Sequence, residues 1–136
     1  MTDKELIAKK LALIETCVQQ LRQLARPAAI ATDVREERFV EHTLQIAIQA
    51  ALDVASHIVS DERLGEPRTN RELFDLLERR GWIEPILAAT MRRMVGFRNI
   101  LVHGYVIVDV GIVVEVVERR LDDLLAFGVA IRARLS

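Results

Sequence analysis

Apolar side chains recur every three to four positions along most of the chain, the spacing produced by one buried face of an α-helix. The first such stretch has apolar residues at Ile7, Leu11, Ile14, Val18 and Leu21. Pro27 follows it, and a proline cannot continue a helix without losing a backbone hydrogen bond. We therefore predict a first helix over residues 3–25.

A second helix is predicted over residues 34–60, where an apolar face runs beside a separate polar stripe. Asp33 precedes this stretch and is a suitable N-cap, because its side chain can accept a hydrogen bond from an unpaired backbone N–H. The polar stripe consists of Gln45, Gln49, Asp53 and Ser56.

Residues 61–70 form the clearest loop, and a short helix is predicted after it over 71–80. Thr69 and Asn70 are cap candidates for its start, and Gly81 suits its C-terminal end.

A fourth helix is predicted from Pro85 to about residue 102, and a last helix over 110–135. The beginning of the last helix is ambiguous. Residues 105–117 are rich in Val and Ile, which favour strands, so a hairpin there is an alternative.

These elements predict an all-α fold, an up-and-down bundle of about five helices. The length of 136 residues fits one domain, 1–136, and a hydrophobic content of 51% with 4% aromatics predicts a mostly aliphatic core. A second copy of the chain could cover any apolar face that remains exposed.

Charge and cysteine content narrow the classes of function. The net charge of −1 means that nucleic-acid binding would rest on a local patch. The single cysteine, Cys17, excludes an intramolecular disulfide and lies at a core position. No charge-free stretch approaches the roughly 18 residues of a membrane span, and no signal peptide is visible, so we expect a soluble, cytoplasmic protein.

The fourth helix has two distinct faces. Its core stripe consists of Leu87, Met91, Met94 and Leu101. The opposite face carries Arg92, Gly96, Asn99 and His103. A glycine among hydrogen-bonding side chains would let another backbone approach closely, although an ordinary solvated face has the same pattern.

Residues 98–105 read RNILVHGY, or R-N-x3-H-x-Y. This phrase resembles the signature of the HEPN ribonucleases and, more narrowly, that of the HepT toxins, in which a Tyr follows the His by two positions. The spacing of Arg and His alone is weak, since Arg35 and His42 also satisfy it. Tyr105, however, is the only tyrosine of the chain.

The residue types of this phrase suit cleavage of RNA. His103 could move protons as the ribose 2′-OH attacks phosphorus, and Arg98 could stabilise charge on the phosphoryl oxygens. Asn99 could orient the histidine or bind phosphate. Two further supports are predicted: Asp53, which could pair with Arg98 or Arg92, and Arg92 itself, which could help to hold phosphate.

We predict no metal site and no cofactor. His42 and His57 are far apart along the helix and lack an HExxH or cysteine partner, so core-edge or solvated positions are expected for both. Cleavage of tRNA or mRNA is therefore expected to be independent of metal and to leave a 2′,3′-cyclic phosphate.

On an ideal helix Arg98 and His103 differ in direction by about 140°. Either the helix distorts before Gly104, or the two groups meet across a two-fold axis. The HEPN resemblance implies the second arrangement, a symmetric homodimer.

The HepT resemblance also implies a toxin neutralised by an MntA-type nucleotidyltransferase antitoxin that transfers AMP to Tyr105. The alternative function is a non-catalytic helical subunit that binds such a nucleotidyltransferase.

Overall fold

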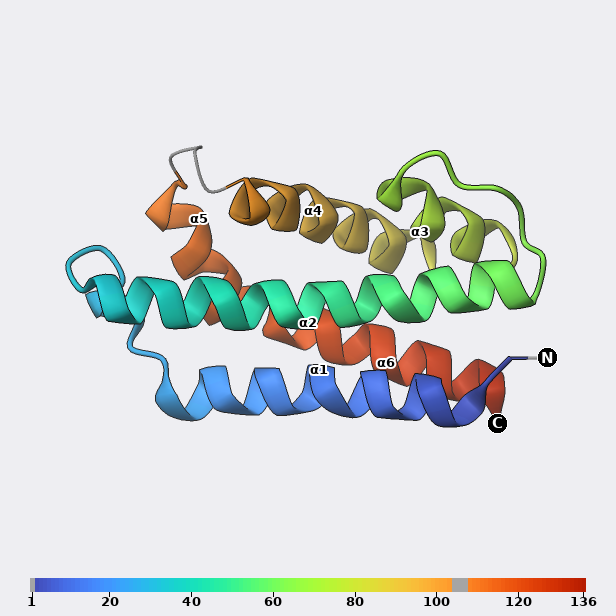
Figure 1. Cartoon of the computed structure of the whole chain (residues 1–136), viewed down its shortest axis with the longest axis horizontal. Helices are drawn as coiled ribbons and strands as arrows, with labels where there is room; N and C mark the ends of the chain where they lie inside the picture. Colours follow the sequence, from blue (N-terminus) through green and yellow to red (C-terminus); the bar gives the residue numbers. More distant parts are fainter. Residues whose placement is uncertain (1, 104–107) are drawn as a thin grey trace.

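Two long antiparallel helices, α1 and α2, form one side of the helical bundle in the computed structural model, which describes residues 2–103 and 108–136 (Figure 1). α1 spans Lys4–Leu24 and α2 spans Val34–Asp61, and a short 3-10 turn, Pro27–Ala29, lies between them. Asp33 caps α2 as predicted, because its side chain accepts a hydrogen bond from the backbone N–H of Arg35.

The next two helices, α3 and α4, lie together on the other side of α2 (Figure 1). α3 spans Asn70–Arg79 and α4 spans Pro85–Val102. Thr69 is the N-cap of α3, and Gly81 follows its end with a φ of +77°, a conformation that favours glycine. The capping predictions for this helix are confirmed.

The last predicted helix consists of three consecutive segments. These are α5 (Val110–Glu115), a π-helical turn η2 (Val116–Arg120) and α6 (Leu121–Leu135). A hairpin is therefore wrong for the described part of its range, because the backbone is helical from Val110 onward. Asp109 explains this start, since its side chain accepts a hydrogen bond from the N–H of Gly111.

The core is largely aliphatic and is shared by all the longer helices. The apolar positions predicted for the first helix are all buried. Cys17 is buried among them, and burial raises the pKa of its thiol. Phe74 of α3 packs edge-to-face on Phe127 of α6, with ring centroids 5.8 Å apart. Helices that are distant in sequence are thus joined through one core.

The all-α, up-and-down prediction is confirmed: the residues that the structure describes contain no strand. α6 returns beside α1, so both chain termini lie at the same end of the bundle (Figure 1). No helix in the described ranges has the length and apolar character needed to cross a membrane.

Candidate active site

The R-N-x3-H phrase lies at the C-terminal end of α4. Arg98 and Asn99 belong to the helix, which ends at Val102. His103 is the C-cap, with φ −83° and ψ 78°, and its backbone N–H donates to the carbonyl oxygen of Asn99 at 3.2 Å. Its side chain is exposed. The helix therefore ends at Val102, before His103, so ideal helical geometry does not fix the directions of Arg98 and His103 relative to each other.

Arg98 points toward α2 and is partly buried. Its Nη2 donates to Oε1 of Gln49 at 2.5 Å, and its Nη1 lies 3.3 Å from Oδ1 of Asn99. Its Nε atom is buried and has no hydrogen-bond partner among the described residues. These contacts bring Arg98 and Asn99 together and add Gln49, to which the sequence analysis assigned no role.

Asp53 reaches Arg98 only through another residue. Nε2 of Gln49 donates to Oδ1 of Asp53 at 2.8 Å, and Nζ of Lys10 donates to Oδ2 at 2.9 Å. The predicted direct pairing of Asp53 with Arg98 or Arg92 is therefore wrong, because Gln49 lies between the carboxylate and Arg98, and Lys10 of α1 supplies the paired cation. The missed signal was the i, i+4 spacing of Gln49 and Asp53 along the polar stripe.

A cavity of about 300 Å³ adjoins this chain of contacts and is lined by residues of α1, α2 and α4, including Lys10, Gln45, Gln49, Asp53 and Arg98. The polar stripe of the second predicted helix thus faces a concave surface that also receives Arg98. Such a surface next to a cation is suited to an anionic or polar ligand.

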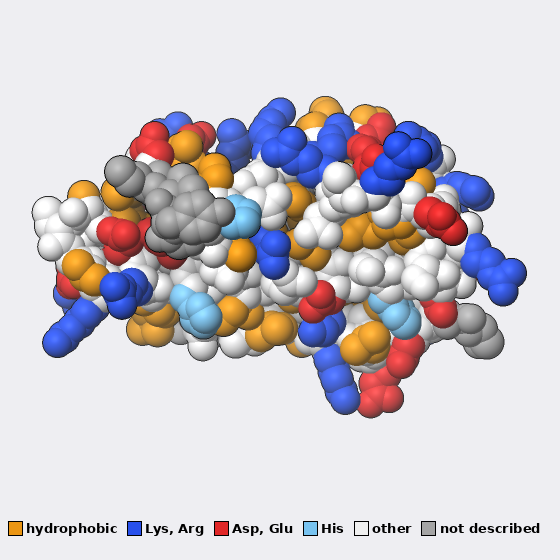
Figure 2. Space-filling model, turned by 45° about the horizontal axis from the view of Figure 1, so that its top comes forward, with side chains coloured by type: hydrophobic (Ala, Val, Ile, Leu, Met, Phe, Trp, Pro, Cys, Tyr) orange, Lys and Arg blue, Asp and Glu red, His pale blue; other side chains and the backbone are white. Residues whose placement is uncertain are grey.

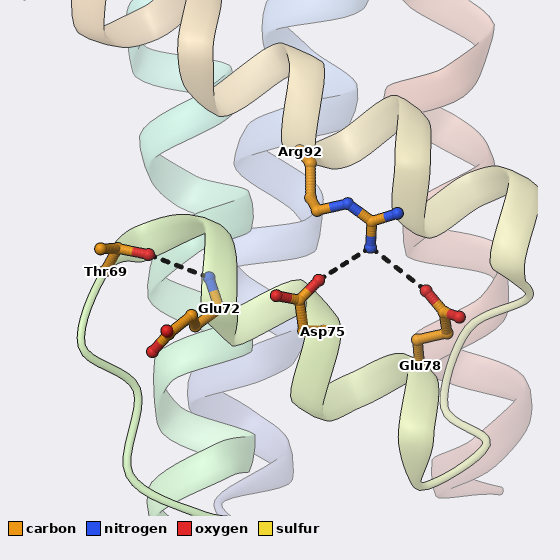
Figure 3. Close-up of polar contacts among 5 residues, drawn as sticks. All are labelled: Thr69, Glu72, Asp75, Glu78 and Arg92. Atoms are coloured by element: carbon orange, nitrogen blue, oxygen red, sulfur yellow. Dashed lines mark hydrogen bonds and ion pairs between the residues drawn. The ribbon is translucent and has the colours of Figure 1, made fainter.

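Arg92 lies on the part of α4 that faces α3. Its Nη1 donates to Oδ1 of Asp75 at 2.9 Å and to Oε1 of Glu78 at 3.1 Å, so one guanidinium bridges two carboxylates of α3 (Figure 3). Thr69 and Glu72 form the cap at the start of the same helix. Arg92 therefore holds α3 against the motif helix, and its charge is balanced by two acidic side chains.

Gly96 provides a close approach, but within the chain. A side-chain carbon at this position would meet the guanidinium of Arg71, which belongs to α3. The structure thus places a side chain of the same chain where the sequence analysis expected another backbone.

Glu41 of α2 is a titratable group to which the sequence analysis assigned no role. Burial of its carboxyl, together with the charge of Glu37 one turn earlier and a hydrogen bond to that residue, raises its pKa to about 7. Its Oε2 is buried and lacks a hydrogen-bond partner among the described residues. Glu41 and His42 line a cavity of about 500 Å³ that reaches Leu101, near the end of α4.

Basic side chains gather over α3 and α4, along the upper part of the face seen in Figure 2. Arg71 of α3 and Arg93 of α4 are exposed, and so is Arg68 in the loop just before α3. The chain thus has a local basic surface near the motif helix, despite its net charge of −1.

The remaining site predictions concern a metal site, Tyr105 and the histidines of α2. Among the residues that the structure describes, no group of three or more His, Cys, Asp or Glu side chains could hold a metal ion. Tyr105 lies outside the described residues. His42 is exposed, and His57 is half-buried at the core edge, where its Nε2 accepts from the N–H of Asp3 at 3.1 Å.

An all-α bundle that carries R-N-x3-H at the end of its fourth helix defines a protein of the HEPN ribonuclease class. A family model described as "Ribonuclease HepT-like" matches residues 13–131. The chain is also 33% identical over 130 residues to an mRNA nuclease HepT from Shewanella oneidensis, across 95% of this chain and 98% of that protein. This chain belongs to the HepT-like ribonuclease family.

Two further similarities support this assignment. A tri-AMPylated HEPN toxin from Shewanella oneidensis, solved in complex with an MNT antitoxin, superposes with a TM-score of 0.90 at 32% identity, covering 96% of this chain and 99% of that one. A tRNA nuclease HepT from Aphanizomenon flos-aquae is 36% identical over 74 residues, 54% of this chain and 50% of that protein.

Proposed function

We propose that this chain is a metal-independent endoribonuclease toxin in which Arg98 and His103 carry the reaction. The observation that carries the proposal is the end of α4, where Arg98 is held by side-chain hydrogen bonds and His103 is exposed directly beyond the helix. The names of the relatives, an mRNA nuclease and a tRNA nuclease, favour RNA as the substrate. The proposed site of action is the cytoplasm.

The proposed reaction is an internal transfer of the phosphoryl group. The 2′-oxygen forms a bond to phosphorus as the bond to the 5′-oxygen breaks, which leaves a 2′,3′-cyclic phosphate and a 5′-hydroxyl. One proton leaves the 2′-OH and one reaches the 5′-oxygen, and an imidazole suits either transfer near neutral pH. The guanidinium of Arg98 stabilises the charge on the non-bridging oxygens.

Three residues have supporting roles in this proposal. Asn99 contacts Arg98 through its side chain and His103 through its backbone carbonyl. Asp53 acts from α2 through Gln49, and Arg92 acts through α3, which it holds beside the motif helix. Residues 1–136 are proposed to work as one domain.

The active form is proposed to be a symmetric homodimer whose cleft collects both copies of Arg98 and His103. Three apolar side chains near the end of α4 and on α5 are between 40% and 44% exposed and could be covered by a second copy: Ile100, Val102 and Ile112. Sedimentation at micromolar concentration tests this, and an active monomer would contradict it.

Regulation is proposed to occur at Tyr105. An MntA-type nucleotidyltransferase would join the Tyr105 oxygen to the α-phosphorus of ATP, breaking the anhydride bond and releasing pyrophosphate. The solved relative, an AMPylated toxin with its antitoxin, supports this assignment. Because Tyr105 follows His103 by two positions, the added phosphate would compete with RNA for Arg98, and the nucleotide would obstruct the cleft.

One experiment tests the activity. The purified chain is incubated with total bacterial RNA and EDTA, and the ends of the fragments are mapped. Cleavage that leaves cyclic phosphate ends and is lost in His103→Ala is the expected result. Cleavage that requires a divalent metal would contradict the mechanism. Absence of cleavage, with retained binding of a nucleotidyltransferase, would favour the non-catalytic subunit instead.

A further inference from the structure

Four side chains form a continuous chain of hydrogen bonds from α1 to α4. Lys10 donates to Asp53, which accepts from Gln49 at its other oxygen, and Gln49 in turn accepts from Arg98. Each of these contacts is partly buried. The two ends of this series of hydrogen bonds are the cations Lys10 and Arg98, and its middle consists of one carboxylate and one amide.

The order of these groups fixes the orientation of the amide. An ionised carboxylate only accepts hydrogen bonds, so the NH2 group of Gln49 faces Asp53. Its carbonyl oxygen consequently faces Arg98, where it accepts from Nη2 at 2.5 Å. Asp53 is held from behind by Lys10, with which it forms an ion pair at 2.9 Å.

A neutral amide in this place has a different effect from that of a carboxylate. A carboxylate against Arg98 would form a paired fork and occupy the charge that the proposed reaction needs. The Gln49 carbonyl instead fixes one amino group of the guanidinium and leaves its full positive charge available. Lys10 balances the charge of Asp53 on the far side of the amide.

We propose that Gln49 is a positioning residue for Arg98, with Asp53 and Lys10 fixing Gln49 in turn. This inference rests on the proposed ribonuclease function, since the group that is positioned is the proposed phosphate-stabilising arginine. Because the groups come from three helices, packing of α1 on α2 sets the position of a cation on α4.

The test compares substitutions at Gln49 in the full chain. Gln49→Met keeps the length of the side chain and removes the acceptor, and Gln49→Glu places a carboxylate against Arg98. Gln20→Met is the matched control, because Gln20 is an exposed glutamine of α1 that does not line this cavity. The substrate is a labelled RNA oligonucleotide containing one site that was mapped in total RNA.

We expect Gln49→Met to lower the single-turnover cleavage rate by about 10-fold or more while KM changes less than about threefold, because the lost geometry matters in the transition state. Gln49→Glu is expected to lower the rate further, and Gln20→Met is expected to change it less than about twofold. In an Arg98→Ala background, Gln49→Met is expected to have no further effect. The proposal would be overturned if Gln49→Met cleaved RNA at the wild-type rate. It would also be overturned if Gln49→Met lowered the rate by the same factor in the Arg98→Ala background as in the wild type.

A second measurement does not depend on catalysis. The ¹⁵N NMR signals of the Arg98 guanidinium report how freely its Nη groups rotate, and we expect slow rotation in the wild type and fast rotation in Gln49→Met and Asp53→Ala. Unchanged signals in Gln49→Met would overturn the positioning role. If the signals change in Gln49→Met but Arg98→Ala cleaves RNA like the wild type, the proposed catalytic function of Arg98 is wrong. The positioning of Arg98 by Gln49 would still be supported.

Discussion

Arg98 lies within the last turns of α4, whereas His103 is the first residue beyond the end of that helix. The two side chains are therefore held by different means. Hydrogen bonds to Gln49 and Asn99 orient Arg98, and the conformation of the helix end orients His103. Substitutions at these two positions are accordingly expected to differ in their effects on the fold.

His103→Ala is expected to lower the rate of RNA cleavage by about 100-fold or more, the contribution usual for an acid–base group. The side chain is exposed, so we expect the thermal midpoint to change by less than about 2 °C. Circular dichroism melting and fragment mapping measure the two quantities. His42→Ala, an exposed histidine of α2, is the control and is expected to keep its activity.

Arg98→Lys keeps the charge and is still expected to reduce cleavage by about 10-fold or more. An ammonium group lacks the planar fork, so it cannot bond to Gln49 and to a phosphoryl oxygen in the same geometry. Arg93→Lys is the matched control on the exposed side of α4. Equal rates for Arg98→Lys and the wild type would show that only the charge of Arg98 matters.

The carboxyl of Glu41 makes stability depend on pH. Its pKa is raised from 4.5 to about 7 in the folded state, so the folded chain keeps a proton that the unfolded chain releases between these values. The free energy of unfolding therefore falls as pH rises from 4.5 through about 7 and is lowest above that range.

Glu41→Gln cannot ionise, so it is expected to be more stable than the wild type at pH 8. The gain is about 1 kcal/mol, well below the full shift, because solvent partly screens the carboxyl. At pH 4 the difference is expected to be near zero. Urea unfolding at both pH values measures the change, with Glu66→Gln in the exposed loop before α3 as control. An equal difference at the two pH values would contradict the prediction.

Arg92→Ala is expected to destabilise the docking of α3 by about 1 kcal/mol, since Asp75 and Glu78 lose their shared cation and then repel each other. Hydrogen exchange of the α3 amides measures this effect locally, and it is expected to increase there more than in α1. Arg93→Ala is the control, because Arg93 is the exposed neighbour of Arg92. Uniform exchange changes throughout the bundle would argue against local bracing.

The helices could be predicted from the sequence because apolar spacing and caps such as Asp33 and Thr69 act locally. The side-chain contacts within the candidate site could not be predicted in this way. The contact between Gln49 and Arg98 joins residues that are 49 positions apart, and Lys10 is 43 positions from Asp53. Only the packing of three helices brings these groups together, and no spacing within one helix reveals it.

The helical prediction over 110–135 was also incomplete, since periodicity alone did not reveal the π turn at Val116–Arg120. A π turn contains one more residue than the α-helical turn that it replaces. Both sides of it are apolar and buried, with Val113 before the turn and Leu121 after it. One averaged helical period therefore fits the two sides imperfectly.

The π turn has a consequence for comparing sequences. A homologue with a regular α-helix here would have one residue fewer, and a gapless alignment would then shift every position of α6 out of phase. Deleting one residue from 116–120 would turn the π turn into a regular α-helical turn and leave α5 and α6 in phase, whereas a deletion within α6 would rotate the residues beyond it by about 100°. Val113 and Leu121 would both stay in the core after a deletion within the π turn, so this segment is the place in the last helix where a one-residue change in length is tolerated.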